Sequence, residues 1–583
     1  MCSPWSTFRR PLPIRPMPLP HPAQALRPPL VSPLLARFLR PGSAWSIPAL
    51  VMVVAAWLAT VGNVALWRQF AALPEASGLR GLLFAAGMGL WIAAVLTAVL
   101  SLTAWPRVFK PVAVALLLTA AASTHFMLAF SVVIDPSMLL NVLHTDSREV
   151  ADLLSPGLFI TLLGVGIAPA WWLWRQPMRP SRWQGRLGAN ALLLLGSLLV
   201  AGLLLVAMFQ DFASLMRNHK QVRYLINPLN SVYALARTAS TAVPHQQRPL
   251  VPVGTDAQLG ASYQHQKQAP WLVLVVGETA RAANFGLGDY PRDTTPQLRA
   301  LQSEGNLSYF RNVRSCGTNT QASVPCMFSH QGKAAFEASE DRYENLLDVL
   351  QRAGLGVVWI DNQSGCKGVC DRVPHSATRE RDDPQWCAQG ECLDEVMLGE
   401  MQRQLDALPA ERKNRGVVVV LHQMGSHGPA YFRRAPEAFK AFKPECQSNV
   451  LQDCTHEALV NSYDNSIRYT DQLLAETVRW LKQQAASTAL LYVSDHGESL
   501  GENNLYLHGL PYSLAPTEQK HVPMLTWLSP AMQQRTGVQT QCLNQQTDLA
   551  LTHDNLFHSV LGLMDIQTHA YQPELDLFRA CGA

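Results

Sequence analysis

The chain has 583 residues, of which 48% are hydrophobic and only 15% are charged. This length predicts at least two structural units, and the charged fraction lies below the roughly 25% typical of soluble domains. The net charge of +4 is small for the length, so the composition gives no support to a nucleic-acid-binding function. The apolar excess falls almost entirely before residue 210, which predicts a membrane-embedded first half.

The first 210 residues divide into a tail and five apolar stretches. Residues 1–45 contain six arginines, eleven prolines and no acidic residue, and we expect a disordered cytoplasmic tail there because this composition cannot build a core. Each apolar stretch approaches the roughly 20 residues needed to cross a bilayer. Together they predict a five-helix transmembrane domain over 46–210, with spans at about 46–67, 82–104, 111–134, 157–174 and 187–209.

The charges of the joints indicate the orientation of these spans. Basic residues lie in the tail and after the second and fourth spans, whereas the joint between the third and fourth is mainly acidic. Loops between transmembrane helices that are rich in lysine and arginine remain in the cytoplasm. Five crossings that start there place the second half in the periplasm, and we expect a multi-pass protein of a bacterial inner membrane.

Residues 211–268 connect the two halves. Arg217, Lys220, Arg223 and Arg237 alternate with leucine, isoleucine and tyrosine, as in an interfacial helix, although a solvated linker fits the pattern equally well. The stretch 240–268 is rich in proline, glycine, glutamine and threonine, and we expect it to be a flexible connection.

Ten of the eleven cysteines lie between Cys316 and Cys581, and Cys2 stands alone. An even number at short spacing predicts disulfides in an oxidising compartment, which agrees with a periplasmic location. Zinc binding by cysteine is the alternative, but the short-spaced cysteines lack the C-x2-C spacing or histidine partners of zinc ribbons. These are Cys366/Cys370, Cys387/Cys392 and Cys446/Cys454.

From about residue 269 the pattern changes to short apolar runs that alternate with longer amphipathic stretches. The runs lie at 271–276, 356–360, 416–422 and 489–494, and the helical candidates at 344–354 and 457–484. This alternation predicts a doubly wound α/β domain with a mainly parallel sheet over 269–583.

Polar residues follow several of these runs directly. Glu278 follows the first run, the segment His422 to His427 ends the third, and Asp495-His496 follows the fourth. Ligands of open α/β sheets bind beyond the carboxyl ends of the strands. Carboxylate and imidazole groups that converge there predict a zinc site.

A candidate nucleophile lies in the segment 315–326. A Cys316–Cys326 bridge would fix this loop around Thr320, and a metal bound to the threonine hydroxyl would lower its pKa and activate it for attack. Thr320 is also a candidate helix N-cap. The residues alone slightly favour the cap.

Five longer segments resemble the phosphoethanolamine transferases, especially the lipid A enzymes, which include chromosomal lipid A transferases and mobile colistin-resistance enzymes. The family belongs to the alkaline phosphatase/sulfatase superfamily. The segments are VVGETARAANFGLGDYPRDTTP (275–296), SCGTNTQASVPCMFS (315–329), DNQSGCKGVCDRVP (361–374), HQMGSHGP (422–429) and YVSDHGESLGENNLYLHGLP (492–511).

The resemblance implies roles for individual residues. It implies a zinc site of Glu278, Thr320, Asp495 and His496, with one catalytic ion or two. It makes Thr320 the nucleophile and His427 and His508 catalytic histidines. It implies substrate contacts from Asn141, Thr145, Glu149, Ser364 and Lys367. It implies disulfides Cys316–Cys326, Cys366–Cys370, Cys387–Cys392 and Cys446–Cys454, which leave Cys542 and Cys581 as a fifth pair.

The resemblance also implies the reaction. We expect a monomeric zinc-dependent transferase that moves phosphoethanolamine from phosphatidylethanolamine to lipid A through Thr320 and confers polymyxin resistance. A core heptose or another glycan as acceptor, and a sulfatase-like phosphohydrolase, are the alternatives. A non-catalytic membrane lipid sensor fits less well, because all four ligand positions are present.

Overall fold

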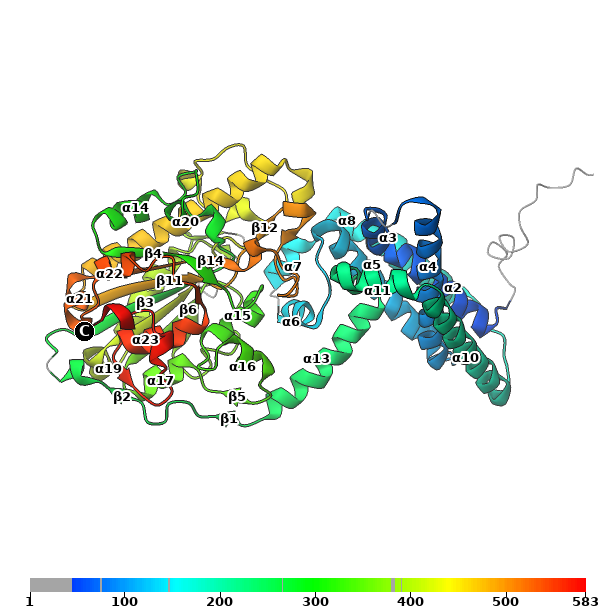
Figure 1. Cartoon of the computed structure of the whole chain (residues 1–583), viewed down its shortest axis with the longest axis horizontal. Coiled ribbons are helices and arrows are strands. Elements are labelled where there is room, and N and C mark those ends of the chain that lie inside the picture. Colours follow the sequence, from blue (N-terminus) through cyan, green and yellow to red (C-terminus); the bar gives the residue numbers. More distant parts are fainter. Residues whose placement is uncertain are drawn as a thin grey trace, which may run out of the picture.

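The computed structural model describes residues 44–582 except 74–75, 145–146, 265, 379–382 and 389–390. The predicted tail therefore lies almost wholly outside the described residues, as does Thr145. The chain forms two halves (Figure 1), which we call the membrane half (residues 44–247) and the α/β half (residues 250–582).

Five apolar helices with mean hydropathies of 1.6 to 2.4 build the membrane half, which confirms the five predicted spans. Their ends differ by a few residues from the predicted ones. The first span joins α2 (Ile47–Thr60), a 3-10 turn (Val61–Asn63) and α3 (Val64–Ala71). The next two are α4 (Gly78–Leu102) and α5 (Phe109–Phe130). The fourth joins α8 (Pro156–Thr161), a π-turn (Leu162–Ile167) and α9 (Ala168–Arg175), and the fifth is α10 (Trp183–Ala207).

Two short helices between α5 and α8 reach the α/β half. They are α6 (Pro136–His144) and α7 (Ser147–Leu153). Phe130 and Val132, at the end of α5, are buried in an apolar cluster of the α/β half, and Leu510 of the α/β half is buried among residues of the membrane half. The two halves therefore share a packed boundary.

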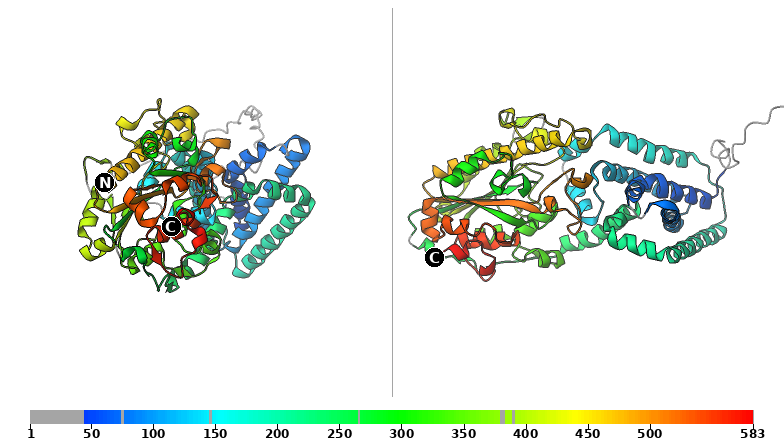
Figure 2. Two further views of the ribbon diagram at one scale, coloured as in Figure 1. Left: turned by 60° about the vertical axis from the view of Figure 1, so that its left-hand side comes forward. Right: turned by 45° about the horizontal axis from the view of Figure 1, so that its top comes forward.

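The connection between the halves is more ordered than its composition predicts. Three helices follow α10, namely α11 (Phe209–Asn218), α12 (Lys220–Tyr224) and α13 (Leu229–Gln247). Figures 1 and 2 show α13 running from the membrane half to the α/β half. The flexible connection predicted over 240–268 is wrong in its first part, which is helical. In its later part β1 (Leu250–Val251) and β2 (Gln258–Leu259) pair with β5 (Arg342–Tyr343) and β16 (Ile566–Gln567). These pairings join residues far apart in the sequence, so local composition gives no sign of them.

An eight-stranded, mainly parallel sheet forms the centre of the α/β half, as predicted. The strand order is β15-β4-β14-β11-β3-β10-β6-β7, and only β14 runs antiparallel to its neighbours. The four predicted apolar runs are β3 (Pro270–Gly277), β6 (Gly356–Asp361), β10 (Val417–His422) and β11 (Ser487–Ser494). The other four are β4 (Leu307–Arg314), β7 (His375–Ala377), β14 (His521–Leu528) and β15 (Leu551–Thr552).

Helices cover both faces of this sheet, which explains why its strands are continuously apolar. Along β3, Leu272 and Leu274 pack in one buried cluster, whereas Val273 and Val275 pack in another. The first cluster includes α15 (Thr320–Met327), α17 (Leu346–Arg352) and α23 (Asp554–Leu563). The second includes α14 (Pro296–Ser303), α18 (Val396–Ala407) and the predicted long helix, α20 (His456–Lys482).

Five disulfides bind loops of the α/β half, in the five pairs expected from the sequence. They are Cys316–Cys326, Cys366–Cys370, Cys387–Cys392, Cys446–Cys454 and Cys542–Cys581.

Candidate active site

Three acidic and imidazole side chains meet where the central strands end. β3 lies between β11 and β10 in the sheet, so Glu278 after β3 lies beside Asp495 and His496 after β11. The Nε2 atom of His496 is 3.4 Å from a carboxylate oxygen of each of the other two residues. All three side chains are completely buried. The convergence expected from the strand ends is therefore present.

Backbone geometry at Thr279 and Gly425 allows this close approach. Thr279 has a φ of 53°, and its N–H donates to Asp495 Oδ1 at 3.3 Å. Gly425 also has a φ of 53°, and a Cβ atom there would lie 2.7 Å from the carbonyl oxygen of Glu278. Any side chain at position 425 would push the Glu278 loop away from the cluster.

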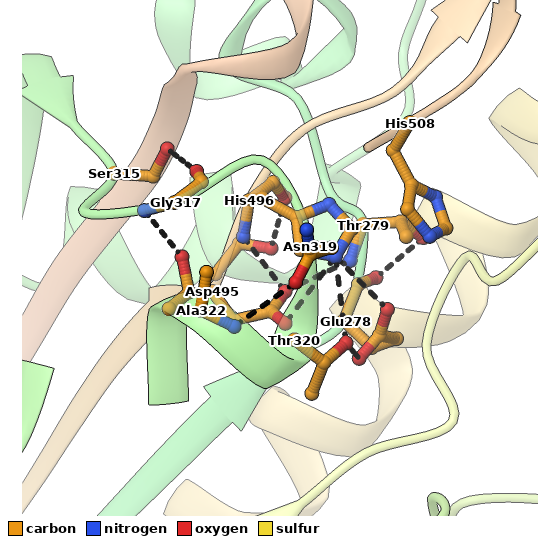
Figure 3. Close-up of polar contacts among 12 residues, drawn as sticks. Glu278, Thr279, Ser315, Gly317, Asn319, Thr320, Ala322, Asp495, His496 and His508 are labelled. Carbon is orange, nitrogen blue, oxygen red and sulfur yellow. Dashed lines mark hydrogen bonds and ion pairs between the residues drawn. The ribbon is translucent and has the colours of Figure 1, made fainter. Parts of the chain in front are cut away.

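Thr320 lies at the first position of α15 and turns its hydroxyl toward this cluster (Figure 3). The hydroxyl donates to Glu278 Oε2 at 3.0 Å and lies 3.5 Å from His496 Nε2. The N-cap of the helix is Asn319, whose side chain accepts from the backbone N–H of Ala322 at 2.9 Å. The N-cap interpretation of Thr320 is therefore wrong, because the preceding residue caps the helix and leaves the threonine hydroxyl to the cluster.

The donor set fits a metal ion. Glu278, Asp495 and His496 each offer one atom, and these atoms lie within 4.8 Å of one another. Among the described residues, Glu278 Oε1 and Asp495 Oδ2 are buried oxygens that accept no hydrogen bond. Leaving buried carboxylate oxygens in this state is costly unless a cation compensates them. Oxygen and imidazole nitrogen ligands suit zinc among other divalent ions.

The electrostatic interactions within the cluster also favour a bound cation. Burial and the charge of Glu278 together raise the pKa of Asp495 to about 6. Burial acts against ionisation of His496, but Asp495 and Glu278 raise its pKa to about 10. Burial also opposes ionisation of Glu278, yet His496 holds the pKa of that carboxyl well below its usual value. Without a metal, a proton on His496 partly neutralises the two carboxylates.

A second buried pair lies behind Glu278, and the sequence analysis noted its histidine, His422, but missed its carboxylate, Asp361. His422, the last residue of β10, has Nδ1 2.9 Å from Asp361 Oδ2, and its Nε2 is 4.0 Å from Glu278 Oε2. Asp361, the last residue of β6, also accepts from the backbone N–H of Gly365 at 2.9 Å. The sequence signal for Asp361 was its position directly after an apolar run. Glu278 and Asp495 of the metal cluster occupy the same kind of position.

The two predicted catalytic histidines lie beside the cluster. The rings of His508 and His496 are 4.4 Å apart, and those of His508 and His427 are 5.6 Å apart. His508 Nδ1 lies 3.4 Å from Glu498 Oε2, which orients the ring. Burial lowers the pKa of His427 to about 3, so its imidazole is neutral near neutral pH.

The predicted substrate residues fall into two groups. Ser364 and Lys367 occupy the loop after β6, where Lys367 Nζ donates to the Ser364 hydroxyl at 2.7 Å. Asn141 lies on α6, which packs against α15. Glu149 lies on α7, and its side chain, like the whole of Thr145, is outside the described part of the structure.

Comparisons with known proteins identify the family. The sulfatase family model matches residues 270–566, and the model for phosphoethanolamine transferase EptA/EptB matches residues 92–243. Phosphoethanolamine transferase EptA of Escherichia coli K12 is 38% identical over 559 residues, which cover 94% of this chain and 99% of that protein. Phosphatidylethanolamine transferase Mcr-1 of Escherichia coli is 36% identical over 532 residues, 89% of this chain and 94% of that protein.

A solved structure agrees with the sequence matches. Lipooligosaccharide phosphoethanolamine transferase A (EptA) of Neisseria meningitidis is similar with a TM-score of 0.87 at 35% identity, covering 93% of this chain and 100% of that chain. The similarity thus includes both halves and their boundary. The chain belongs to the phosphoethanolamine transferase family of EptA and Mcr-1, within the alkaline phosphatase/sulfatase superfamily.

Proposed function

We propose that the chain transfers phosphoethanolamine from phosphatidylethanolamine to a phosphate of lipid A through a covalent intermediate on Thr320. The observation that carries this proposal is the position of the Thr320 hydroxyl. It points into a buried cluster of carboxylates and imidazole and lies 3.0 Å from Glu278 Oε2. A hydroxyl in this position has a carboxylate beside it to accept its proton, as an activated nucleophile requires.

Glu278, Thr320, Asp495 and His496 are the residues that would hold zinc. A bound zinc ion would lower the pKa of the threonine hydroxyl and stabilise negative charge on the phosphoryl oxygens. The buried oxygens Glu278 Oε1 and Asp495 Oδ2 support this assignment, because a cation would compensate both of them.

In the first half-reaction Thr320 Oγ1 attacks the phosphorus of phosphatidylethanolamine. The Oγ1–P bond forms, the bond from phosphorus to the diacylglycerol oxygen breaks, and the threonine proton passes toward Glu278. The leaving oxygen takes a proton from His508, which Glu498 orients. Diacylglycerol departs, and phosphoethanolamine remains on Thr320.

In the second half-reaction a phosphate oxygen of lipid A attacks the same phosphorus. The new P–O bond forms as the bond to Oγ1 breaks, Thr320 regains its proton from Glu278, and the proton of the attacking phosphate returns to His508. The Neisseria relative is named for action on lipooligosaccharide, and its similarity extends over nearly the whole chain. Kdo(2)-lipid A phosphoethanolamine 7''-transferases match at 35% identity over 44% of this chain (Escherichia coli) and at 28% over 79% (Salmonella typhimurium). Both sets of names point to a lipid A-containing acceptor, and a lipid A phosphate is the acceptor that we propose.

The five spans and the disulfides support a location in the bacterial inner membrane with the α/β half in the periplasm, where both lipids are accessible. We expect a monomer. Added amines would reduce the negative charge of the outer membrane and weaken the binding of cationic polymyxins.

The test is the intact mass of the full-length protein after incubation with phosphatidylethanolamine and no acceptor. We expect one added phosphoethanolamine group on Thr320 and none in Thr320→Ala. Thr536→Ala, at the end of α21 (Pro530–Thr536) and remote from the cluster, is the matched control and should be labelled normally. Equal transfer to lipid A by Thr320→Ala would contradict the mechanism.

A further inference from the structure

A buried ionic contact joins the two halves close to the active site. Asp152, on α7 of the membrane half, is 5% exposed. Its Oδ1 lies 3.0 Å from Arg433 Nη1, and its Oδ2 lies 3.4 Å from Arg434 Nη2. The side-chain amide of Asn449 donates to the Asp152 carbonyl oxygen at 2.9 Å. Loop composition alone did not predict this contact, although Asp152 belongs to the acidic joint between the third and fourth spans.

The two arginines differ in what they hold on their other side. The side chain of Arg434 is 4% exposed, and its Nε donates to the backbone carbonyl of His427 at 2.8 Å. Its Nη1 pairs with Glu391 Oε2 at 3.0 Å. The side chain of Arg433 is 41% exposed and has no described hydrogen bond to the His427 segment. Arg434 therefore connects the Asp152 carboxylate of the membrane half to the backbone carbonyl of His427. Arg433 contacts the same carboxylate without this second link, so it is a suitable control.

The segment that carries His427 borders a cavity at its start. A cavity of about 540 Å³ is lined by Met424, Gly425, Glu391 and both arginines. Several hydrogen bonds hold the segment, among them those from the backbone N–H groups of Met424 and Gly425 to Asp394. The guanidinium of Arg434, which lies between Asp152, Glu391 and the His427 carbonyl, links the segment to the membrane half.

We propose that Arg434, clamped by Asp152 of the membrane half, is a positioning residue that holds His427 in place for the transfer reaction. The contact of α7 with the α/β half then affects the rate of the transfer step as well as the delivery of lipid. The inference rests on the proposed function, in which His508, whose ring lies 5.6 Å from that of His427, protonates the leaving oxygen. Displacements of about 1 Å in such a site can lower rates by roughly a hundredfold.

The experiment uses the full-length protein in vesicles and a second, soluble donor, the p-nitrophenyl ester of phosphoethanolamine. We compare wild type with Asp152→Asn, Arg434→Gln, their double variant and Arg433→Gln. Asp453→Asn, an exposed carboxylate outside the contact, is the unaffected control. For each we measure kcat and KM with both donors, the zinc content and the thermal unfolding temperature.

We expect Asp152→Asn and Arg434→Gln each to lower kcat about tenfold or more with both donors, because the displaced group acts on the chemical step. Zinc content should be unchanged, since neither residue contacts the metal ligands. The double variant should lose little more than either single one, as expected for residues that act as one unit. Arg433→Gln should lower kcat less than threefold.

Three results would overturn the proposal. One is an increase of KM for phosphatidylethanolamine alone, with normal turnover of the soluble donor, which would assign Asp152 to lipid docking. Another is an equal loss in Arg433→Gln and Arg434→Gln. The third is a lower unfolding temperature with unchanged kcat, which would make the contact purely structural. Failure of the wild type to label Thr320 would instead refute the proposed function, so the two failures are distinguishable.

Discussion

Buried polar groups are arranged differently in the two halves. In the membrane half, the side-chain NH2 of Asn227 donates to the carbonyl of Ala120 at 2.7 Å and the carbonyl of Gly62 at 3.1 Å. The backbone N–H of Asn227 donates to Asn63 Oδ1 at 2.8 Å. In the α/β half, Glu278 and Asp495 are equally buried, and each keeps a carboxylate oxygen without a hydrogen bond among the described residues, as the amide oxygen of Asn227 also does. The two sets differ in charge, because the asparagine side chain is neutral and the carboxylates can ionise.

This difference separates polar groups that hold the fold from polar groups that hold a ligand. The asparagine network ties the segment before α13 to the first and third spans, where unsatisfied backbone groups would be costly. The carboxylates bring two negative charges together and gain nothing from each other without a cation. Substitutions should therefore separate stability from metal binding.

The largest effect is expected for Glu278→Gln. This change keeps the shape but removes one ligand charge, and it should lower zinc affinity more than about 100-fold, since even residues behind the ligands contribute 10- to 100-fold. Transfer to lipid A should fall in parallel. The metal-free protein should unfold at a similar temperature, because the loss of repulsion between Glu278 and Asp495 is offset by the loss of attraction between Glu278 and His496.

Zinc titration and thermal unfolding of the metal-free, detergent-solubilised protein provide the measurement. Glu457→Gln, an exposed carboxylate at the start of α20, is the matched control and should change neither quantity. A strongly destabilised metal-free Glu278→Gln protein would show instead that the cluster holds the fold.

A smaller effect is expected for Asp361→Asn, because Asp361 acts on the metal cluster through His422. Loss of the Asp361 charge weakens the contact that orients the His422 imidazole, whose Nε2 lies 4.0 Å from Glu278 Oε2. Zinc affinity should fall roughly 10- to 100-fold, as for other groups that orient ligands. Zinc titration measures this, with the exposed Asp406→Asn as control. Unchanged affinity would exclude a role for the His422–Asp361 pair.

Local patterns in the sequence predict much of this architecture. The apolar stretches and runs predict the five spans and the central strands, and the residues after the strands predict the metal cluster. Local patterns could not choose between two roles for Thr320, because that choice depends on which side chain, Asn319 or Thr320, accepts from the helix N–H groups.

The remaining features depend on contacts between residues far apart in the chain. The left-handed backbone of Thr279 follows from packing against Asp495 and not from its own preference. β1 and β2 have two residues each and exist only through pairing with β5 and β16. The contact of Asp152 with Arg434 links residues 282 positions apart, so no local pattern could indicate it.

The smallest effect on activity is expected for Asn227→Ala. This change tests the buried polar groups of the membrane half, as the earlier changes test those of the α/β half. The change removes the donors to the Gly62 and Ala120 carbonyls and to Thr124 Oγ1, and should lower the free energy of unfolding by about 1–3 kcal/mol. Zinc affinity and the kcat of the folded protein should stay unchanged, because the network lies in the membrane half. Thermal unfolding in detergent, with the exposed Asn218→Ala as control, checks the stability. Loss of zinc with unchanged unfolding would reverse the roles assigned to the two sets of buried polar groups.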